Sequence, residues 1–193
     1  MIGVLVSGTG TNLQALLDEG LPVVAVASNN TNAQALDRAA QAGIEAGVFP
    51  AVEFPSREDR DRELADWLSQ RGVELVVLAG YMQLLTASFL EPFAGRILNV
   101  HPSLLPAFPG TRAVEDALAH GVKVTGATVH FVDEGVDTGP IVLQEAVDVH
   151  PDDTAESLHA RIQEVEHRLL PRAVRLYLDG VLRFPVAGRV VSA

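Results

Sequence analysis

The segment Asn99-Val100-His101-Pro102 carries the strongest chemical signal in the chain. The apolar run before it predicts a buried strand, and the two-residue period of a strand places Asn99 and His101 on one face. Because Pro102 breaks the strand, both side chains are expected at its carboxyl end, where open parallel sheets bind ligands. An amide donor beside a titratable imidazole suits oxyanion stabilisation with proton transfer. The alternative is a polar strand end that is bonded only to its own loop.

Three carboxylates follow in a turn-rich segment that ends at Gly139-Pro140. Asp133 and Glu134 fit the ordinary role of capping and solvating a turn. Asp137 has a second role open to it. If the fold brings Asp137 to His101, its charge favours the imidazolium and raises the imidazole pKa. Sequence spacing alone does not establish that contact.

His130 alternates with Thr128 on another expected strand, and lies either in the same site as His101 or in the core as a hydrogen-bonded histidine. A metal site built from His101, His130 and Asp137 is the weakest alternative, because no HExxH-type spacing supports it. Surface or capping positions are expected for the other histidines, His120, His150, His159 and His167. The chain has no cysteine and no Gly-x-Ser-x-Gly elbow, which removes thiol and serine nucleophiles.

A glycine-containing turn, residues 7–12 with the sequence SGTGTN, joins the first expected strand to the first helix. Backbone N–H groups and the helix dipole at such a turn favour an anion such as phosphate. The turn lacks the third glycine of the dinucleotide fingerprint and the lysine of a P-loop. It therefore predicts an anion site outside the familiar cofactor classes, or a structural turn in which glycine permits the reversal.

The elements that must position these residues alternate between short apolar runs and helical spacing, as in βαβ units. Strands are expected at 2–6, 23–27, 73–78 and 97–100, and helices at 12–17, 33–42, 56–70 and 111–119. Ser56 is the expected N-cap of the third helix, and Gly43 and Gly72 are expected to end the second and third.

The pattern changes after Gly121, where strands at 124–132 and 141–149 follow each other without a helix-length spacer. This spacing predicts an antiparallel pair. Residues 152–178 predict a long helix that Pro171 kinks or splits, followed by a strand at 181–186. The expected fold class is α/β, a Rossmann-like, mostly parallel twisted sheet with helices on both faces and an antiparallel C-terminal extension.

Composition restricts the function further. The 193 residues suit one domain, and 48% hydrophobic with 20% charged residues suits a globular core. Fourteen Lys+Arg against 25 Asp+Glu give a formal net charge of −11, which disfavours a nucleic-acid partner. No apolar run reaches the roughly 18 residues of a membrane span, and no basic leader opens the chain. A cytoplasmic protein without a membrane partner is expected.

Four ordered motifs together resemble the folate-dependent formyltransferases: residues 7–13, 76–82, 99–106 and 126–140, the last ending in DTGP. The resemblance implies a single formyltransferase domain over 1–193, with a nucleotide-phosphate half at about 1–100 and a folate and catalytic half at about 101–193. It also implies direct, metal-free transfer of the formyl group of 10-formyltetrahydrofolate to the amine of glycinamide ribonucleotide, in purine biosynthesis. The products are N-formylglycinamide ribonucleotide and tetrahydrofolate.

The resemblance also implies roles for individual residues. Asn99 donates to the oxyanion of a tetrahedral intermediate, His101 is the general acid or proton shuttle, and Asp137 holds and charges the imidazole. Glycinamide ribonucleotide is assigned to Gly10, Thr11, Asn12 and Glu166. Folate is assigned to Arg57, Met82, Gln83, Leu84, Leu85, Asn99, Val132 and Asp133. Close relatives often carry Arg where Gln83 stands, so this position departs from the family pattern.

Four further hypotheses compete with formyl transfer to glycinamide ribonucleotide. A transferase acting on tRNA needs an added RNA-binding domain and fits the net charge poorly, and a hydrolase of formyltetrahydrofolate carries an extra N-terminal domain. A different small amine, such as a sugar nucleotide, and a folate- or nucleotide-binding module without turnover stay open. The expected assembly is a monomer or a homodimer.

Overall fold

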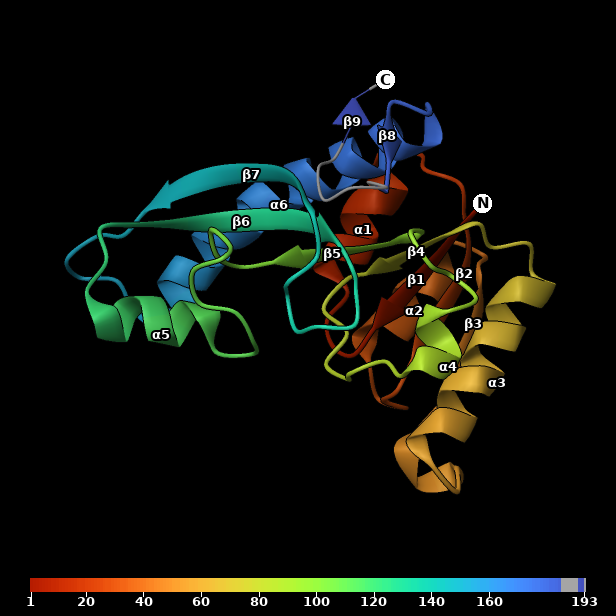
Figure 1. The fold of residues 1–193 in the computed structure, drawn as a ribbon. Helices are drawn as coiled ribbons and strands as arrows, with labels where there is room; N and C mark the ends of the chain where they lie inside the picture. The colour runs from red at the N-terminus through yellow and green to blue at the C-terminus, as the bar shows by residue number, and fades with distance from the viewer. Residues whose placement is uncertain (185–190, 193) are drawn as a thin grey trace. The chain divides into compact units, whose positions relative to one another are not determined.

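The computed structural model describes residues 1–184 and 191–192 (Figure 1). Seven strands form one mixed sheet in the order β3-β2-β1-β4-β5-β6-β7. Strand β1 pairs in parallel with β2 and β4, β2 pairs in parallel with β3, and β6 and β7 are antiparallel. The predicted fold class, a mostly parallel sheet with antiparallel C-terminal strands and helices around it, is confirmed.

The bounds of the elements are as follows. The strands are β1 Ile2–Val6, β2 Val23–Ser28, β3 Glu45–Val48, β4 Leu75–Leu78, β5 Ile97–His101, β6 Val124–Phe131, β7 Ile141–Asp148, β8 Leu182–Arg183 and β9 Val191–Ser192. The helices are α1 Thr11–Asp18, α2 Gln34–Gln41, α3 Arg57–Gln70, α4 Ala87–Leu90, α5 Ala113–His120 and α6 Ala155–Leu178, with a short 3₁₀ turn η1 at Ala51–Glu53. The chain divides into two compact units, Met1–Leu98 (unit 1) and Asn99–Ala193 (unit 2).

Unit 1 follows the expected βαβ pattern, and every residue of β1 and β4 is buried, as parallel strands covered on both faces require. The Ser56 side chain accepts a hydrogen bond from the Asp59 backbone N–H, so the predicted N-cap of α3 is confirmed. Gly43 and Gly72 follow the ends of α2 and α3 with φ values of 68° and 69°, which confirms their helix-ending role. Strand β4 begins two residues later than predicted, because the Val73 N–H bonds to Leu68 at the end of α3.

Unit 2 contains the antiparallel pair β6 and β7, as predicted, and the long helix α6, which packs against both strands (Figure 1). Helix α6 begins at Ala155 because Thr154 is its N-cap, and Ser157 completes a capping box with it. Of the two predicted effects of Pro171, a kink or a split, the split is wrong, because α6 is continuous from Ala155 to Leu178. Pro171 is buried in a continuous stripe with Leu169, Leu170 and other apolar residues, and this burial outweighs the lost backbone hydrogen bond.

Of the strand predicted at 181–186, the structure has β8, which pairs with β9, while residues 185 and 186 lie outside the described residues. Strand β3, helix α4 and the turn η1 were not predicted. Throughout the described part of the chain, every helix, α6 included, is too short or too polar to span a membrane.

Candidate active site

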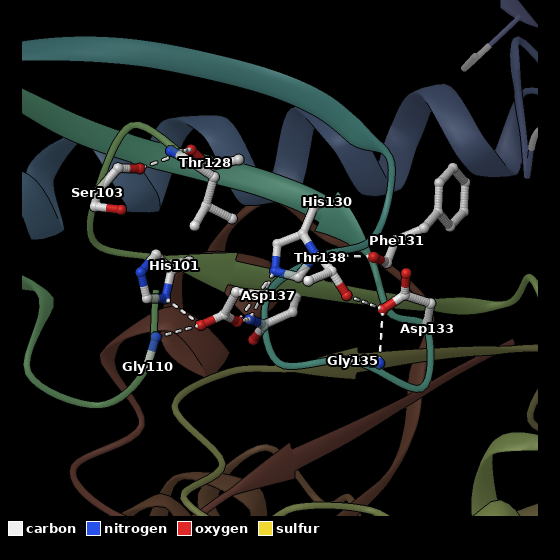
Figure 2. Close-up of polar contacts among 12 residues, drawn as sticks. His101, Ser103, Gly110, Thr128, His130, Phe131, Asp133, Gly135, Asp137 and Thr138 are labelled. Atoms are coloured by element: carbon white, nitrogen blue, oxygen red, sulfur yellow. Dashed lines mark hydrogen bonds and ion pairs between the residues drawn. The ribbon is translucent and has the colours of Figure 1, made fainter. Parts of the chain in front are cut away.

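Asp137 lies at the centre of a cluster of polar groups in unit 2 (Figure 2). Its Oδ2 atom is 3.3 Å from His101 Nδ1 and accepts a hydrogen bond of 2.8 Å from the Gly110 N–H. Its Oδ1 atom is 3.5 Å from His130 Nε2 and 3.5 Å from Asn99 Nδ2. The structure therefore brings together the three residues of the expected set, Asn99, His101 and Asp137, and adds His130 to them.

Two elements supply this cluster. Strand β5 ends at His101, so Asn99 and His101 share one face, and His101 is 4% exposed. Asp137 comes from the loop between β6 and β7 and has a left-handed backbone with a φ of 55°. In the same loop Asp133 accepts hydrogen bonds from the Gly135 N–H and the Thr138 hydroxyl, 3.1 and 2.7 Å long. Asp133 thus organises the turn that presents Asp137.

The loop is closed tightly at its far end. A Cβ atom on Gly139 would lie 1.8 Å from the Phe131 carbonyl oxygen, so no side chain fits there. The Phe131 N–H in turn donates to the Pro140 carbonyl at 2.9 Å. The two ends of the loop are therefore pinned beside the start of the β6–β7 ladder, which fixes the position of Asp137 between them.

Both ring nitrogens of His101 face hydrogen-bond acceptors. Its Nε2 atom is 2.8 Å from the Phe108 carbonyl oxygen, and its Nδ1 atom faces the Asp137 carboxylate. Both partners can only accept hydrogen bonds, so the ring satisfies both only when both of its nitrogens carry protons. A protonated imidazole held by a carboxylate is suited to donate a proton or to stabilise developing negative charge.

His130 connects the cluster to the core. It is 2% exposed, and its Nδ1 atom is 2.8 Å from the Phe131 carbonyl, which makes Nδ1 a donor. Its Nε2 atom lies 3.0 Å from Asn99 Nδ2. That nitrogen can accept from the amide when the ring is neutral, or donate to Asp137 when the ring is charged. His130 has features of both positions considered from the sequence: it shares Asp137 with His101, and it is buried and hydrogen-bonded.

The amide nitrogen of Asn99 has two partners in this arrangement. Its Nδ2 atom is directed to His130 at 3.0 Å and to Asp137 at 3.5 Å. An oxyanion that takes a hydrogen bond from Asn99 must replace one of these partners. The contact with Asp137 is the longer and therefore the weaker of the two, so this is the bond that exchange would break.

The pKa of Asp137 is lowered, although burial by itself raises it. Hydrogen bonding to His130, the hydrogen bond from the Gly110 N–H and the nearby imidazoles of His101 and His130 together outweigh that burial. Asp137 is consequently a carboxylate at neutral pH and not a proton donor. Within the described residues, no group of three or more Asp, Glu or His side chains is arranged to hold a metal ion.

The glycine-containing turn of unit 1 has the geometry of a helix N-terminus. Gly10 is the N-cap of α1, with a left-handed φ of 74°. The carbonyl groups of Gly8 and Thr9 are turned toward α2, where they accept from the Ala35 N–H at 3.1 Å and from Arg38 Nε at 2.9 Å. The start of α1 is thus left with backbone N–H donors and the positive end of the helix dipole, as an anion site needs.

Replacing Gly10 with alanine is expected to destabilise unit 1. The new Cβ would lie 2.5 Å from Ala35 Cβ and 2.8 Å from its Cα, on a backbone already at positive φ. The expected loss in the free energy of unfolding is about 2 to 4 kcal/mol, measured by urea denaturation. Gly8→Ala is the matched control, because nothing lies within 4 Å of its Cβ position. Equal stability of the two variants would contradict this account of the turn.

The remaining expected ligand residues lie in both units. Arg57 is the first residue of α3 and is exposed. Met82 and Leu84 are 61% and 59% exposed, in the loop after β4. Gln83 and Leu85 are half-buried in the same loop, Asn12 is buried in α1, and Val132 and Asp133 follow β6. Glu166, on α6, is 4% exposed.

The other histidines match their expected positions with one exception. His120 Nδ1 bonds to the Asp116 carbonyl at the end of α5, and His150 and His159 are exposed. His167 was expected at the surface, but its Nε2 atom is buried and has no hydrogen-bond partner among the described residues. It lies on the part of α6 that is buried against the strands of unit 2, which explains the difference.

Sequence reasoning missed Gly110, whose backbone N–H contacts Asp137 and leaves no trace in residue type. It also missed the buried pair Arg60 and Asp61, which lie in a run of charged residues on α3. For His130 a signal existed, since its alternation with Thr128 placed both on one face of β6.

Comparison with known proteins adds to this geometry. The formyl transferase family model matches residues 1–174. The chain is 47% identical over 187 residues to the trifunctional purine biosynthetic protein adenosine-3 of Drosophila melanogaster. This alignment covers 93% of the present chain but 14% of that protein. It is 42% identical over 189 residues to phosphoribosylglycinamide formyltransferase of Escherichia coli, covering 94% of this chain and 89% of the relative. The chain therefore spans about one seventh of the trifunctional relative and most of the bacterial one.

Solved structures agree with these relatives. Glycinamide ribonucleotide transformylase 1 from Symbiobacterium toebii superimposes with a TM-score of 0.96 at 51% sequence identity, covering 99% of this chain and 92% of that one. Phosphoribosylglycinamide formyltransferase from Coxiella burnetii superimposes with a TM-score of 0.93 at 37% identity, again over 99% of this chain.

Proposed function

The chain belongs to the formyl transferase family, and from this premise we propose that it moves the formyl group of 10-formyltetrahydrofolate to the amine of glycinamide ribonucleotide. The products are N-formylglycinamide ribonucleotide and tetrahydrofolate. The observation that carries the proposal is the contact of His101 with Asp137, beside Asn99, in a chain whose bacterial relatives bear the name of this enzyme.

The proposed reaction begins with attack of the acceptor amine on the formyl carbon. A C–N bond forms, the carbonyl oxygen becomes an oxyanion, and a tetrahedral intermediate results. Asn99 donates to that oxyanion, exchanging its long contact with Asp137 for the stronger negative acceptor. The intermediate collapses when the bond to N10 of the folate breaks, N10 gains a proton and the new amide nitrogen loses one.

His101 serves this step as the proton shuttle. Charged, it stabilises the oxyanion and supplies a proton to the leaving nitrogen, and the neutral ring then receives the proton that the attacking amine loses. Asp137 holds the ring in place through its contact with Nδ1, and its own lowered pKa keeps it ionised. Asp137 remains a carboxylate throughout the cycle.

The substrate assignments rest on the resemblance together with local geometry. We assign the acceptor phosphate to Gly10, Thr11 and Asn12, where the start of α1 offers backbone donors. Glu166 is assigned to the amine end of the acceptor, because a carboxylate complements an ammonium group.

The donor is assigned to Arg57 and to the loop residues Met82, Gln83, Leu84 and Leu85 in unit 1. In unit 2 it is assigned to Asn99 and to the main chain of Val132 and Asp133. The exposed Met82 and Leu84 side chains supply apolar contact area for an aromatic ligand.

The proposed cellular setting follows from the reaction. A folate-dependent step of purine biosynthesis uses small-molecule substrates that are found in the cytoplasm, and we place the protein there. No metal, nucleic acid or membrane takes part in the proposed reaction. The assembly is proposed to be a monomer or a homodimer.

The deciding experiment follows the absorbance of the released folate product with and without glycinamide ribonucleotide. Acceptor-dependent release is the expected result, and N-formylglycinamide ribonucleotide should be identified by mass spectrometry. Release without acceptor would replace the proposal with hydrolysis. No release with this acceptor, but release with another small amine such as a sugar nucleotide, would reassign the acceptor and keep the chemistry. No release with any amine would leave a binding function.

A further inference from the structure

Helix α3 contains a pair of charged side chains that the proposed reaction does not use. Arg60 and Asp61 are 1% and 0% exposed, although the helix sequence around them, REDRDRE, is rich in charge. The Arg60 Nε and Nη2 atoms both donate to Asp61 Oδ1, at 3.0 and 2.6 Å. Taking two charges out of water costs about as much as their attraction returns, so stability alone does not account for the pair.

Both residues of the pair also form a hydrogen bond to one loop, residues 82–86 between β4 and α4. Arg60 Nη1 donates to Gln83 Oε1 at 3.2 Å. Asp61 Oδ2 accepts from the Thr86 backbone N–H at 2.6 Å. Helices α3 and α4 lie side by side in unit 1, which brings these groups within reach (Figure 1).

This loop depends on outside partners for its conformation. It has no helical or strand ladder of its own, so its backbone groups need partners from elsewhere. A third anchor fixes its start, where the Met82 N–H donates to Ser7 Oγ at 2.8 Å. Two apolar side chains, Met82 and Leu84, nevertheless stay exposed on this anchored loop. The hydrogen bonds to Arg60, Asp61 and Ser7 fix the conformation of the loop, while its apolar side chains stay exposed to solvent. These are the properties of a preformed binding surface.

We propose that Arg60 and Asp61 are positioning residues that preform the 82–86 loop for the formyl donor. The inference rests on the proposed function for the identity of the ligand. Arg60 also orients the Gln83 amide: its oxygen faces the guanidinium, so its NH₂ group is turned away from Arg60 and suits a hydrogen-bond acceptor on the ligand.

The test removes the charges and keeps the volume. Arg60→Met alone leaves Asp61 buried and unpaired, so the main variant is the double substitution Arg60→Met with Asp61→Asn, whose new amide still has an oxygen for the Thr86 N–H. Arg71→Met is the matched control: Arg71 is the C-cap of α3 and pairs with Glu45, but no contact joins it to the loop among the described residues.

In the double variant, amide hydrogen exchange across 82–86 should quicken about tenfold or more, because local opening becomes easier. The KM for 10-formyltetrahydrofolate should rise about tenfold, while kcat and the KM for the acceptor stay within about threefold, as expected when only donor binding is impaired. Arg71→Met should change neither exchange in the loop nor the donor KM.

Unchanged exchange in the loop of the folded double variant would overturn the proposal. So would a fall in kcat with the donor KM unchanged. The exchange measurement needs no turnover, so it decides the positioning role even if the wild-type chain fails to transfer formyl groups. Faster exchange in the loop of the double variant, in a chain without transferase activity, would confirm that Arg60 and Asp61 position the loop. It would overturn the formyl donor as the ligand of the loop.

Discussion

His101→Ala should lower kcat by about 10² to 10⁴, because proton transfer by a positioned side chain contributes a factor of that size. The fold should survive the change. The Phe108 carbonyl keeps a hydrogen bond from Ser103 Oγ, at 3.3 Å, and Asp137 keeps the one from Gly110. The measurement is single-turnover formyl transfer at saturating substrates, with thermal unfolding of the same sample.

His159→Ala is the control for this substitution. His159 is an exposed histidine of α6 in the same unit and should tolerate the change with wild-type kcat. Binding of a folate analogue to His101→Ala should stay within about threefold of wild type, because the imidazole is assigned to the chemical step. Turnover by His101→Ala at a rate near wild type would remove His101 from the mechanism.

Asn99→Ala should lower kcat by about 10² to 10³, the range seen when one preorganised oxyanion donor is lost. The KM for the acceptor should change by less than about threefold, and kcat should fall far more than the KM for the formyl donor rises, since the oxyanion forms only in the transition state. Steady-state kinetics with each substrate varied in turn measure both effects. Asn99 is half-buried, so the loss of packing should be small.

Asn99→Asp separates hydrogen-bond donation from volume. It keeps the size of the side chain but removes the N–H donors, and it places a second carboxyl group near Asp137, at the position where the amide nitrogen was 3.5 Å from Oδ1. It should therefore be at least as slow as Asn99→Ala. An aspartate variant as active as the wild type would show that Asn99 acts through shape alone.

The parts of the fold that could be predicted are those in which one local rule decides the structure. The all-apolar runs in β1 and β4 have few alternatives to a strand buried on both faces, and Ser56 before a charged turn is a strong N-cap signal. Strand β3 reads Glu-Ala-Gly-Val and lies at the edge of the sheet with three of its four residues exposed. Such a strand has neither alternation nor an apolar run, and only its pairing with β2 defines it.

Two kinds of sequence signal predict the candidate site: the two-residue period of a strand, and the resemblance of its motifs to a known family. Asn99 and His101 share a face because they are two residues apart on β5. The contact of Asp137 with His101 depends on how a loop folds back, which spacing does not encode. The burial of Arg60 depends on partners more than 20 residues away, as its bond to Gln83 illustrates, and so lies beyond any local pattern.

The left-handed backbone of Asp137 has a consequence for how this position tolerates change. At a φ of 55°, a residue with a Cβ atom carries a steric cost of about 1 to 2 kcal/mol that glycine avoids. Stability and catalysis therefore pull this position in opposite directions, since glycine relaxes the loop while abolishing the carboxylate. Laboratory evolution for heat resistance alone should enrich glycine at 137 among survivors that have lost turnover, whereas selection for growth that requires the cell to make the reaction product should retain the strained aspartate.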